Sequence, residues 1–129
     1  MTHLLTLLFA ASLLAPAAQA EIYELRTYTA AEGKLPQLVA RFRNHTVKLF
    51  VKHGMKNVGY WVPQDAPGSQ NTLVYLLAHK DRASAQKNWE AFRNDPEWIR
   101  VRDQSEANGK LVLNIVSVFL NPTDFSPLK

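Results

Sequence analysis

The segment LVLNIVSVFL, residues 111–120, most constrains the fold of this chain. Successive side chains of a strand point to opposite faces of its sheet, so this segment divides into two sets of five. Both sets are mainly apolar, with Asn114 and Ser117 as the polar exceptions. Neither set can face water along its whole length. We therefore expect one set to meet helices and the other set to meet a partner.

The remainder of the chain predicts the element order β-α-β-β-α-β. Apolar residues with helical spacing follow Pro36, and Gly54 is suited to end that helix. Asp95 can cap a further helical piece whose first residue is Pro96. This order predicts an α+β, ferredoxin-like fold, with a four-stranded sheet and helices on one face. The expected strands span residues 22–29, 55–63, 71–80 and 111–120, and the expected helices span 35–53 and 81–94 with the piece after 95.

The second face of this sheet also needs a cover. Four strands of about six residues give roughly 400 Å² of flat sheet at the usual spacings, and more than this as accessible area. Leaving that area in water would forfeit on the order of 10 kcal/mol, which is comparable with the whole stability of a domain, about 5–15 kcal/mol. A second copy of the chain is the simplest cover, so we expect a homodimer whose sheets pack face to face.

Residues 1–20 have the pattern of a signal peptide. They contain no Lys, Arg, Asp or Glu, the run from Leu4 to Leu14 is almost entirely apolar, and Ala18-Gln19-Ala20 resembles a cleavage site. A buried N-terminal helix is the alternative interpretation. The signal interpretation predicts a mature domain of residues 21–129 that is periplasmic or secreted and has no membrane anchor after cleavage.

The composition argues against several classes of function. The chain has no cysteine and a net charge of +4 that is spread along its length. Export and the lack of a basic block argue against a nucleic-acid partner. No glycine-rich nucleotide loop, serine-hydrolase motif or metal-binding motif occurs, so we expect no cofactor and no metal.

Three parts of the sequence together resemble the NIPSNAP family. They are the start Tyr23-Glu24-Leu25-Arg26-Thr27-Tyr28, the turn His53-Gly54 with Gly59-Tyr60-Trp61, and the run from Trp89 through Asp95-Pro96-Glu97-Trp98. The resemblance extends from Glu21 to about Pro127. It implies the dimeric α/β-barrel fold, and it implies little chemistry, because the family has no settled reaction. The wider superfamily includes cofactor-free monooxygenases, haem enzymes and isomerases, and fold does not choose among them.

The first strand carries a carboxylate, a guanidinium and a phenol on one face, from Glu24, Arg26 and Tyr28. One interpretation is that Glu24 and Arg26 form an ion pair with each other, beside a tyrosine whose ring belongs to the core. The other is a binding site in which Arg26 and Tyr28 hold an anion or oxyanion. An empty cavity bounded by these residues and the first helix would favour an enzyme, and a filled core would favour a module without catalysis.

Three histidines follow the signal segment. We expect His53 to cap the first helix at its negative end, and His79 to be a surface residue. His45 lies at the edge of the apolar stripe of the first helix and is the candidate general base. The aromatic residues are mostly core by their periodicity but could wall a flat ligand. The candidate binding residues are Glu24, Arg26, Tyr28, Tyr60, Tyr75 and Trp89.

Two hypotheses of function remain open. The first is a small-molecule binding or structural module that takes a small apolar or anionic ligand. The second is a cofactor-independent monooxygenase or isomerase of a small aromatic or enolisable substrate, with Arg26, Tyr28 and His45 as the catalytic candidates.

Overall fold

The computed structural model describes residues 10–11 and 21–129. Apart from residues 10–11, the predicted signal peptide of residues 1–20 therefore lies outside the described residues. Within the described ranges, no helix has the length and apolar character needed to cross a bilayer.

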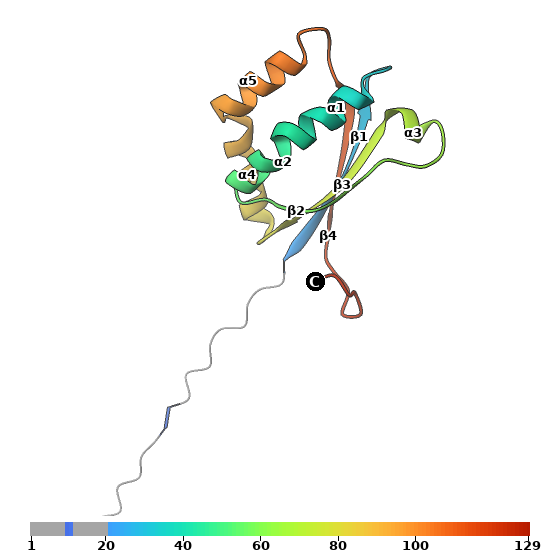
Figure 1. Ribbon diagram of the computed structural model, residues 1–129. Coiled ribbons are helices and arrows are strands. Elements are labelled where there is room, and N and C mark those ends of the chain that lie inside the picture. The colour runs from blue at the N-terminus through green and yellow to red at the C-terminus, as the bar shows by residue number, and fades with distance from the viewer. Residues whose placement is uncertain (1–9, 12–20) are drawn as a thin grey trace, which may run out of the picture.

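Four antiparallel strands form one sheet in the order β2-β3-β1-β4. The central strand β1 places Arg26 opposite Tyr75 of β3 on one side and opposite Ser117 of β4 on the other. Figure 1 shows helices α1, α2, α4 and α5 on one face of the sheet. The predicted α+β, ferredoxin-like arrangement is confirmed. The strands are β1 (Ile22–Ala30), β2 (Lys56–Trp61), β3 (Thr72–His79) and β4 (Val112–Leu120), and the helices are α1 (Leu35–Arg41), η1 (Phe42–Thr46), α2 (Val47–Lys52), α3 (Gly68–Asn71), α4 (Arg82–Arg93) and α5 (Pro96–Ser105).

Local sequence signals explain most helix ends. The Asp95 side chain accepts a hydrogen bond from the Glu97 N–H at 2.8 Å, and Pro96 occupies the first turn of α5. Gly54 follows α2 with a φ of 78°, the left-handed conformation that a glycine adopts without strain. The predicted helix ends at these positions are confirmed. The short α3 lies in a segment where the sequence indicated only a turn-rich loop.

The first long helix is not a regular α-helix. Its middle, η1, is a π-helix of five residues between α1 and α2. The Thr46 hydroxyl donates to the Arg41 carbonyl at 3.3 Å, which closes the wide turn. The sequence predicted one continuous helix, because the apolar residues before and after η1 are spaced as in an α-helix. Since π turns often occur at functional sites, the side chains at η1 are candidates for part of such a site.

The sheet face opposite the helices carries exposed apolar side chains, which we call the open face. Val116 is 49% exposed, and Trp61 is 54% exposed and lies across Gly59. Near Tyr23, the C-terminal segment after β4 covers one end of this face. Contrary to expectation, the helix-side set of β4 is also partly uncovered, because Ile115 is 47% exposed. The reason is that β4 is an edge strand with a cavity beside it.

Candidate functional site

Glu24 is the centre of a buried hydrogen-bond network that joins three strands to α4. The side chain is 1% exposed, and its two oxygens accept four hydrogen bonds. A carboxylate has about four lone-pair sites, so Glu24 is fully satisfied. The donors are His79 Nε2 at 2.8 Å, Trp89 Nε1 at 2.7 Å, Arg26 Nη1 at 2.8 Å and Ser117 Oγ at 2.6 Å.

The network fixes the charges of its members. Burial acts to raise the pKa of Glu24, but the four hydrogen bonds outweigh it and lower this pKa from 4.5 to about 2. Burial also acts to lower the pKa of Arg26, but the neighbouring tyrosines and Glu24 raise it above its ordinary value. Glu24 and Arg26 therefore form a stable ion pair. His79 is 1% exposed, so its assignment as a surface residue is wrong; it ends β3 on the inner face, where it meets Glu24.

Arg26 connects this network to a pair of tyrosines. Its Nε donates to the Tyr75 hydroxyl at 2.8 Å, and its Nη2 donates to the Tyr28 hydroxyl at 3.1 Å. The Tyr75 hydroxyl in turn donates to the Tyr28 hydroxyl at 2.8 Å. Tyr28 thus accepts two hydrogen bonds, and its own proton remains available to donate. Burial raises the pKa of Tyr75 well above its usual value, which keeps that hydroxyl protonated as a donor.

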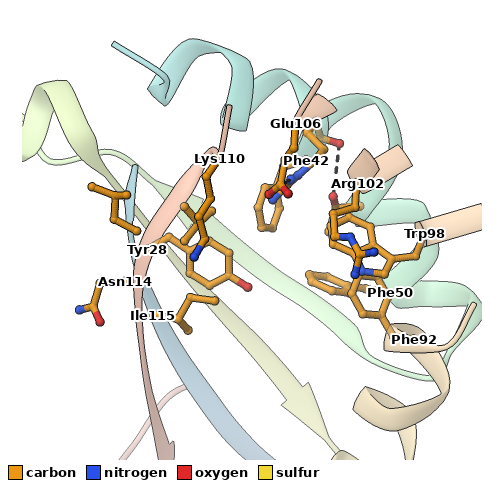
Figure 2. Close-up of a pocket in the computed structure, with 14 residues that line it drawn as sticks. Tyr28, Phe42, Phe50, Phe92, Trp98, Arg102, Glu106, Lys110, Asn114 and Ile115 are labelled. Carbon is orange, nitrogen blue, oxygen red and sulfur yellow. Dashed lines mark hydrogen bonds and ion pairs between the residues drawn. The ribbon is translucent and has the colours of Figure 1, made fainter. Parts of the chain in front are cut away.

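An open cavity of about 360 Å³ lies between the sheet and the helices, and we call it the sheet–helix cavity. Figure 2 shows Tyr28, Asn114 and Ile115 on the strand side and Phe42, Phe50, Phe92 and Trp98 on the helix side. Its volume lies within the ~300–1,000 Å³ range typical of small-molecule sites. The lining is Tyr28, Arg41, Phe42, Thr46, Phe50, Phe92, Trp98, Arg102, Glu106, Lys110, Val112, Leu113, Asn114 and Ile115.

Arg41 is the buried cation of this cavity. Its side chain is 6% exposed, and its Nη1 donates to Ser105 at 3.2 Å and lies 3.6 Å from Glu106. The Nε is buried without a hydrogen-bond partner. Its guanidinium carbon lies 5.0 Å from the centre of the Trp98 ring. Burial lowers the pKa of Arg41, and Glu106 opposes this effect only in part. Because Nε has no partner and Nη1 donates only to Ser105, the guanidinium has fewer acceptors than a buried charge requires.

The cavity brings together only part of the predicted site. Tyr28 lines it, whereas Tyr75 is fully buried and Tyr60 stacks on Tyr75 with ring centres 5.1 Å apart. His45 is exposed and lines a groove on the outer side of the helices with Gln37 and Ser105, and Arg41 borders both this groove and the cavity. It therefore does not reach the space between helix and sheet, because its position on η1 points away from the sheet.

Glu24, Arg26 and Trp89 line a separate groove between α4 and β4. Arg82 and Arg93 of α4 line the same groove, and the guanidinium carbon of Arg26 lies 4.1 Å from the centre of the Trp89 ring. Arg26 thus contacts the sheet–helix cavity only through Tyr28.

Sequence reasoning missed the polar residues of the cavity. Arg41 precedes the π turn and Thr46 is its last residue, while Arg102, Glu106 and Lys110 come from α5 and the segment that follows it. No local pattern distinguishes any of these residues from the other polar residues of its segment. Only the packing of α5 against the first helix shows that they line one cavity. Within the described ranges, no group of three or more His, Asp or Glu side chains is placed to hold a metal ion.

His53 ends α2 as its C-cap, as predicted, and it also contacts α5. Its Nε2 lies 2.7 Å from Asp95 Oδ2, and Lys52 Nζ lies 2.8 Å from the same oxygen. The hydrogen bond from Lys52 leads the effects that lower the pKa of Asp95 below its usual range. This cluster joins two helix ends and lies outside the cavity lining.

The fold and the cavity define an α+β, ferredoxin-like protein with a small-molecule-sized space between sheet and helices. The NIPSNAP family model matches residues 23–127. The chain belongs to the NIPSNAP family. No match was found among curated proteins.

Solved structures with the same fold include family members and enzymes. A NIPSNAP family protein of unknown function from Agrobacterium tumefaciens is 22% identical with a TM-score of 0.72, over 84% of this chain and 94% of that chain. SnoaB, a cofactor-independent oxygenase from Streptomyces nogalater, is 12% identical with a TM-score of 0.54, over 83% and 97%. The ActVA-Orf6 monooxygenase from Streptomyces coelicolor, in complex with nanaomycin D, is 17% identical with a TM-score of 0.55, over 80% and 88%. At these identities the likeness is one of fold.

Proposed function

We propose that this protein binds a small, planar, oxygen-bearing molecule in the sheet–helix cavity. The observation that carries the proposal is the Tyr28 hydroxyl, which accepts hydrogen bonds from Arg26 and Tyr75 and so has its own proton free to donate. The aromatic side chains Phe42, Phe50, Phe92 and Trp98 supply apolar walls for a flat ring. An oxygen of the ligand beside Tyr28 would accept a hydrogen bond from the Tyr28 hydroxyl, and the rings of the ligand would displace water from these walls.

Titration calorimetry with β-naphthol tests this proposal, because the probe combines a flat ring with one hydroxyl. We expect binding to the wild type, and a loss of about threefold to tenfold in Tyr28→Phe, as for one neutral hydrogen bond of ~0.5–1.5 kcal/mol. Ile115→Trp should abolish binding, since Ile115 lines the cavity and is half exposed. Val51→Trp is the matched control, because Val51 is exposed on α2 outside the cavity lining. Equal affinity in wild type and Ile115→Trp would contradict the proposal. Native mass spectrometry of the purified protein would show whether a natural ligand is retained.

A second candidate is catalysis of proton transfer or oxygenation on the same ligand without a cofactor. Tyr28, supported by Arg26, is placed to donate to an enolate or phenolate oxygen. Glu106 is the carboxylate of the cavity lining, so proton abstraction would fall to Glu106 rather than to His45. The fold likeness to SnoaB and ActVA-Orf6 agrees with this candidate.

Deuterium exchange into β-tetralone, followed by NMR in D₂O, tests for such catalysis. An enzyme would exchange the protons next to the carbonyl faster than buffer does, and both Tyr28→Phe and Glu106→Gln would slow it. Oxygen uptake with a dihydroxynaphthalene tests for oxygenation. Binding of β-naphthol without either activity would leave the binding module as the function.

We further propose that the protein is an exported homodimer whose two sheets pack through their open faces. Trp61, Val116, Val118 and Leu120 are each 39–54% exposed on this face. A standard interface buries ~800 Å² of accessible surface on each partner, and this is the size of interface that the proposal requires. A closed two-fold arrangement is the usual way to bury such a surface. Sedimentation of the wild type as a folded monomer at micromolar concentration would contradict the proposal.

A further inference from the structure

We propose that the ligand of the sheet–helix cavity is an aromatic carboxylate whose acid group is bound by Arg41. This inference rests on the proposed function, because it concerns the same cavity, and it adds the charge of the ligand. It starts from the one charged side chain of the cavity that is almost fully buried.

Arg41 lacks the acceptors that a buried guanidinium normally has. Nη1 is its only nitrogen with partners in residues 21–129, and those partners are Ser105 at 3.2 Å and Glu106 at 3.6 Å. The distance to Glu106 is longer than a hydrogen bond, and the Glu106 side chain is 30% exposed. By contrast, Arg26 donates from all three of its nitrogens to Glu24, Tyr28 and Tyr75. Folding therefore satisfies Arg26, which is 13% exposed, and leaves the more deeply buried Arg41 under-satisfied where it borders the cavity.

A ligand carboxylate is the chemical group that would complete Arg41. Two carboxylate oxygens match the planar fork of a guanidinium, and the resulting charge-assisted hydrogen bonds are among the strongest in proteins. The bond also gains strength from the low polarity of the surrounding walls. A neutral oxygen would leave the charge of Arg41 uncompensated, so the site favours an anion.

The electrostatics of the cavity point in the same direction. Arg102 and Lys110 line it together with Arg41, whereas Glu106 is the only acidic residue in the lining. Arg102 is already paired with Asp103 at 3.1 Å, but Lys110 is exposed and makes no ion pair in the described part of the chain. The excess positive charge would attract an anion, while the rings of Phe42 and Phe50 receive its apolar part.

The test compares two probes that differ in charge but hardly in shape, β-naphthoate and the neutral β-naphthamide. Titration calorimetry near neutral pH should show the carboxylate binding the wild type at least ~tenfold more tightly than the amide. This ratio should fall toward one in Arg41→Gln and fall in part in Lys110→Gln. It should stay unchanged in Lys48→Gln, which removes the same charge from an exposed position outside the cavity lining.

The outcomes separate this inference from the proposed function. A ratio near one in the wild type overturns the inference, and binding of β-naphthol in the same protein would then leave the proposed function standing. Failure of all three probes to bind would overturn both. A wild-type ratio that survives in Arg41→Gln would also overturn the assignment to Arg41. If Arg41→Gln does not fold, Arg41→Lys replaces it: this variant keeps the charge but loses the fork, so an unchanged ratio contradicts a forked contact.

Discussion

Replacing Glu24 with glutamine gives the sharpest test of the buried network. Glu24 is 1% exposed and accepts four hydrogen bonds. In Glu24→Gln an amide nitrogen must face either His79 and Trp89 or Arg26 and Ser117. Either Trp89 or Arg26, each of which can only donate, then meets a donor instead of an acceptor, and Arg26 loses its counter-charge. Breaking a buried ion pair in this way costs about 3–5 kcal/mol.

The pKa of Glu24 gives a second, independent magnitude. Its folded-state pKa is lowered from 4.5 to about 2. Because the folded pKa is the lower of the two, the ionised carboxylate stabilises the fold above about pH 4.5, and this stabilisation is lost as the pH falls toward about 2. At 1.36 kcal/mol for each unit, the contribution is about 3 kcal/mol.

Urea unfolding at a series of pH values, followed by circular dichroism at one protein concentration, measures this contribution. The wild type should be about 3 kcal/mol more stable than Glu24→Gln near neutral pH. The difference should shrink as the pH falls below about 4.5, because a protonated Glu24 resembles glutamine. Glu90→Gln, at an exposed position of α4, should change stability by less than ~0.5 kcal/mol throughout. A difference between wild type and Glu24→Gln that is small, or that does not vary with pH, would refute the reasoning.

Three further predictions concern assembly, a helix cap and export. Val116→Asp should convert the proposed dimer to a monomer in sedimentation velocity, whereas Ile115→Asp should leave it dimeric, since these neighbours lie on opposite faces of β4. Equal behaviour of the two variants would argue against the open-face interface. Asp95→Ala should lower the free energy of unfolding by about 1–2 kcal/mol through loss of the α5 cap, and an unchanged melting temperature would contradict this. Mass spectrometry of protein from the cell envelope should find Glu21 at the N-terminus, and an N-terminal Met1 there would speak against the signal peptide.

Much of the fold could be read from the sequence, because its signals are local. Apolar spacing marks the strands and helices, and Asp95, Pro96 and Gly54 mark helix ends through backbone effects that need no distant partner. The pairing of Glu24 with Arg26 was also foreseeable, since residues two apart on a strand share a face.

The missed features share a different physical cause. His79 ends a strand among polar neighbours, and only the pairing of β3 with β1 places it against Glu24. The apolar residues before and after η1 are spaced as in an α-helix, so the pattern gives no sign of the π turn. The sequence places His45 at the edge of the apolar stripe of the first helix, but it does not show which edge of the stripe faces the sheet. Packing decides this, and it leaves His45 on the outer side.

The sequence by itself determined the order of the strands and main helices, the α+β fold and the resemblance to the NIPSNAP family, and it placed Glu24 beside Arg26 on one face of β1. These depend on periodicities and caps that act over a few residues. The tertiary structure alone decided the site. The cavity exists because β4 is an edge strand and α5 closes over it, which brings Arg41, Glu106 and Lys110 beside Tyr28. These residues are up to 82 positions apart, from Tyr28 to Lys110, and no local rule links them. Whether a side chain is satisfied or left without acceptors, as Arg26 and Arg41 are, depends on neighbours that only folding supplies.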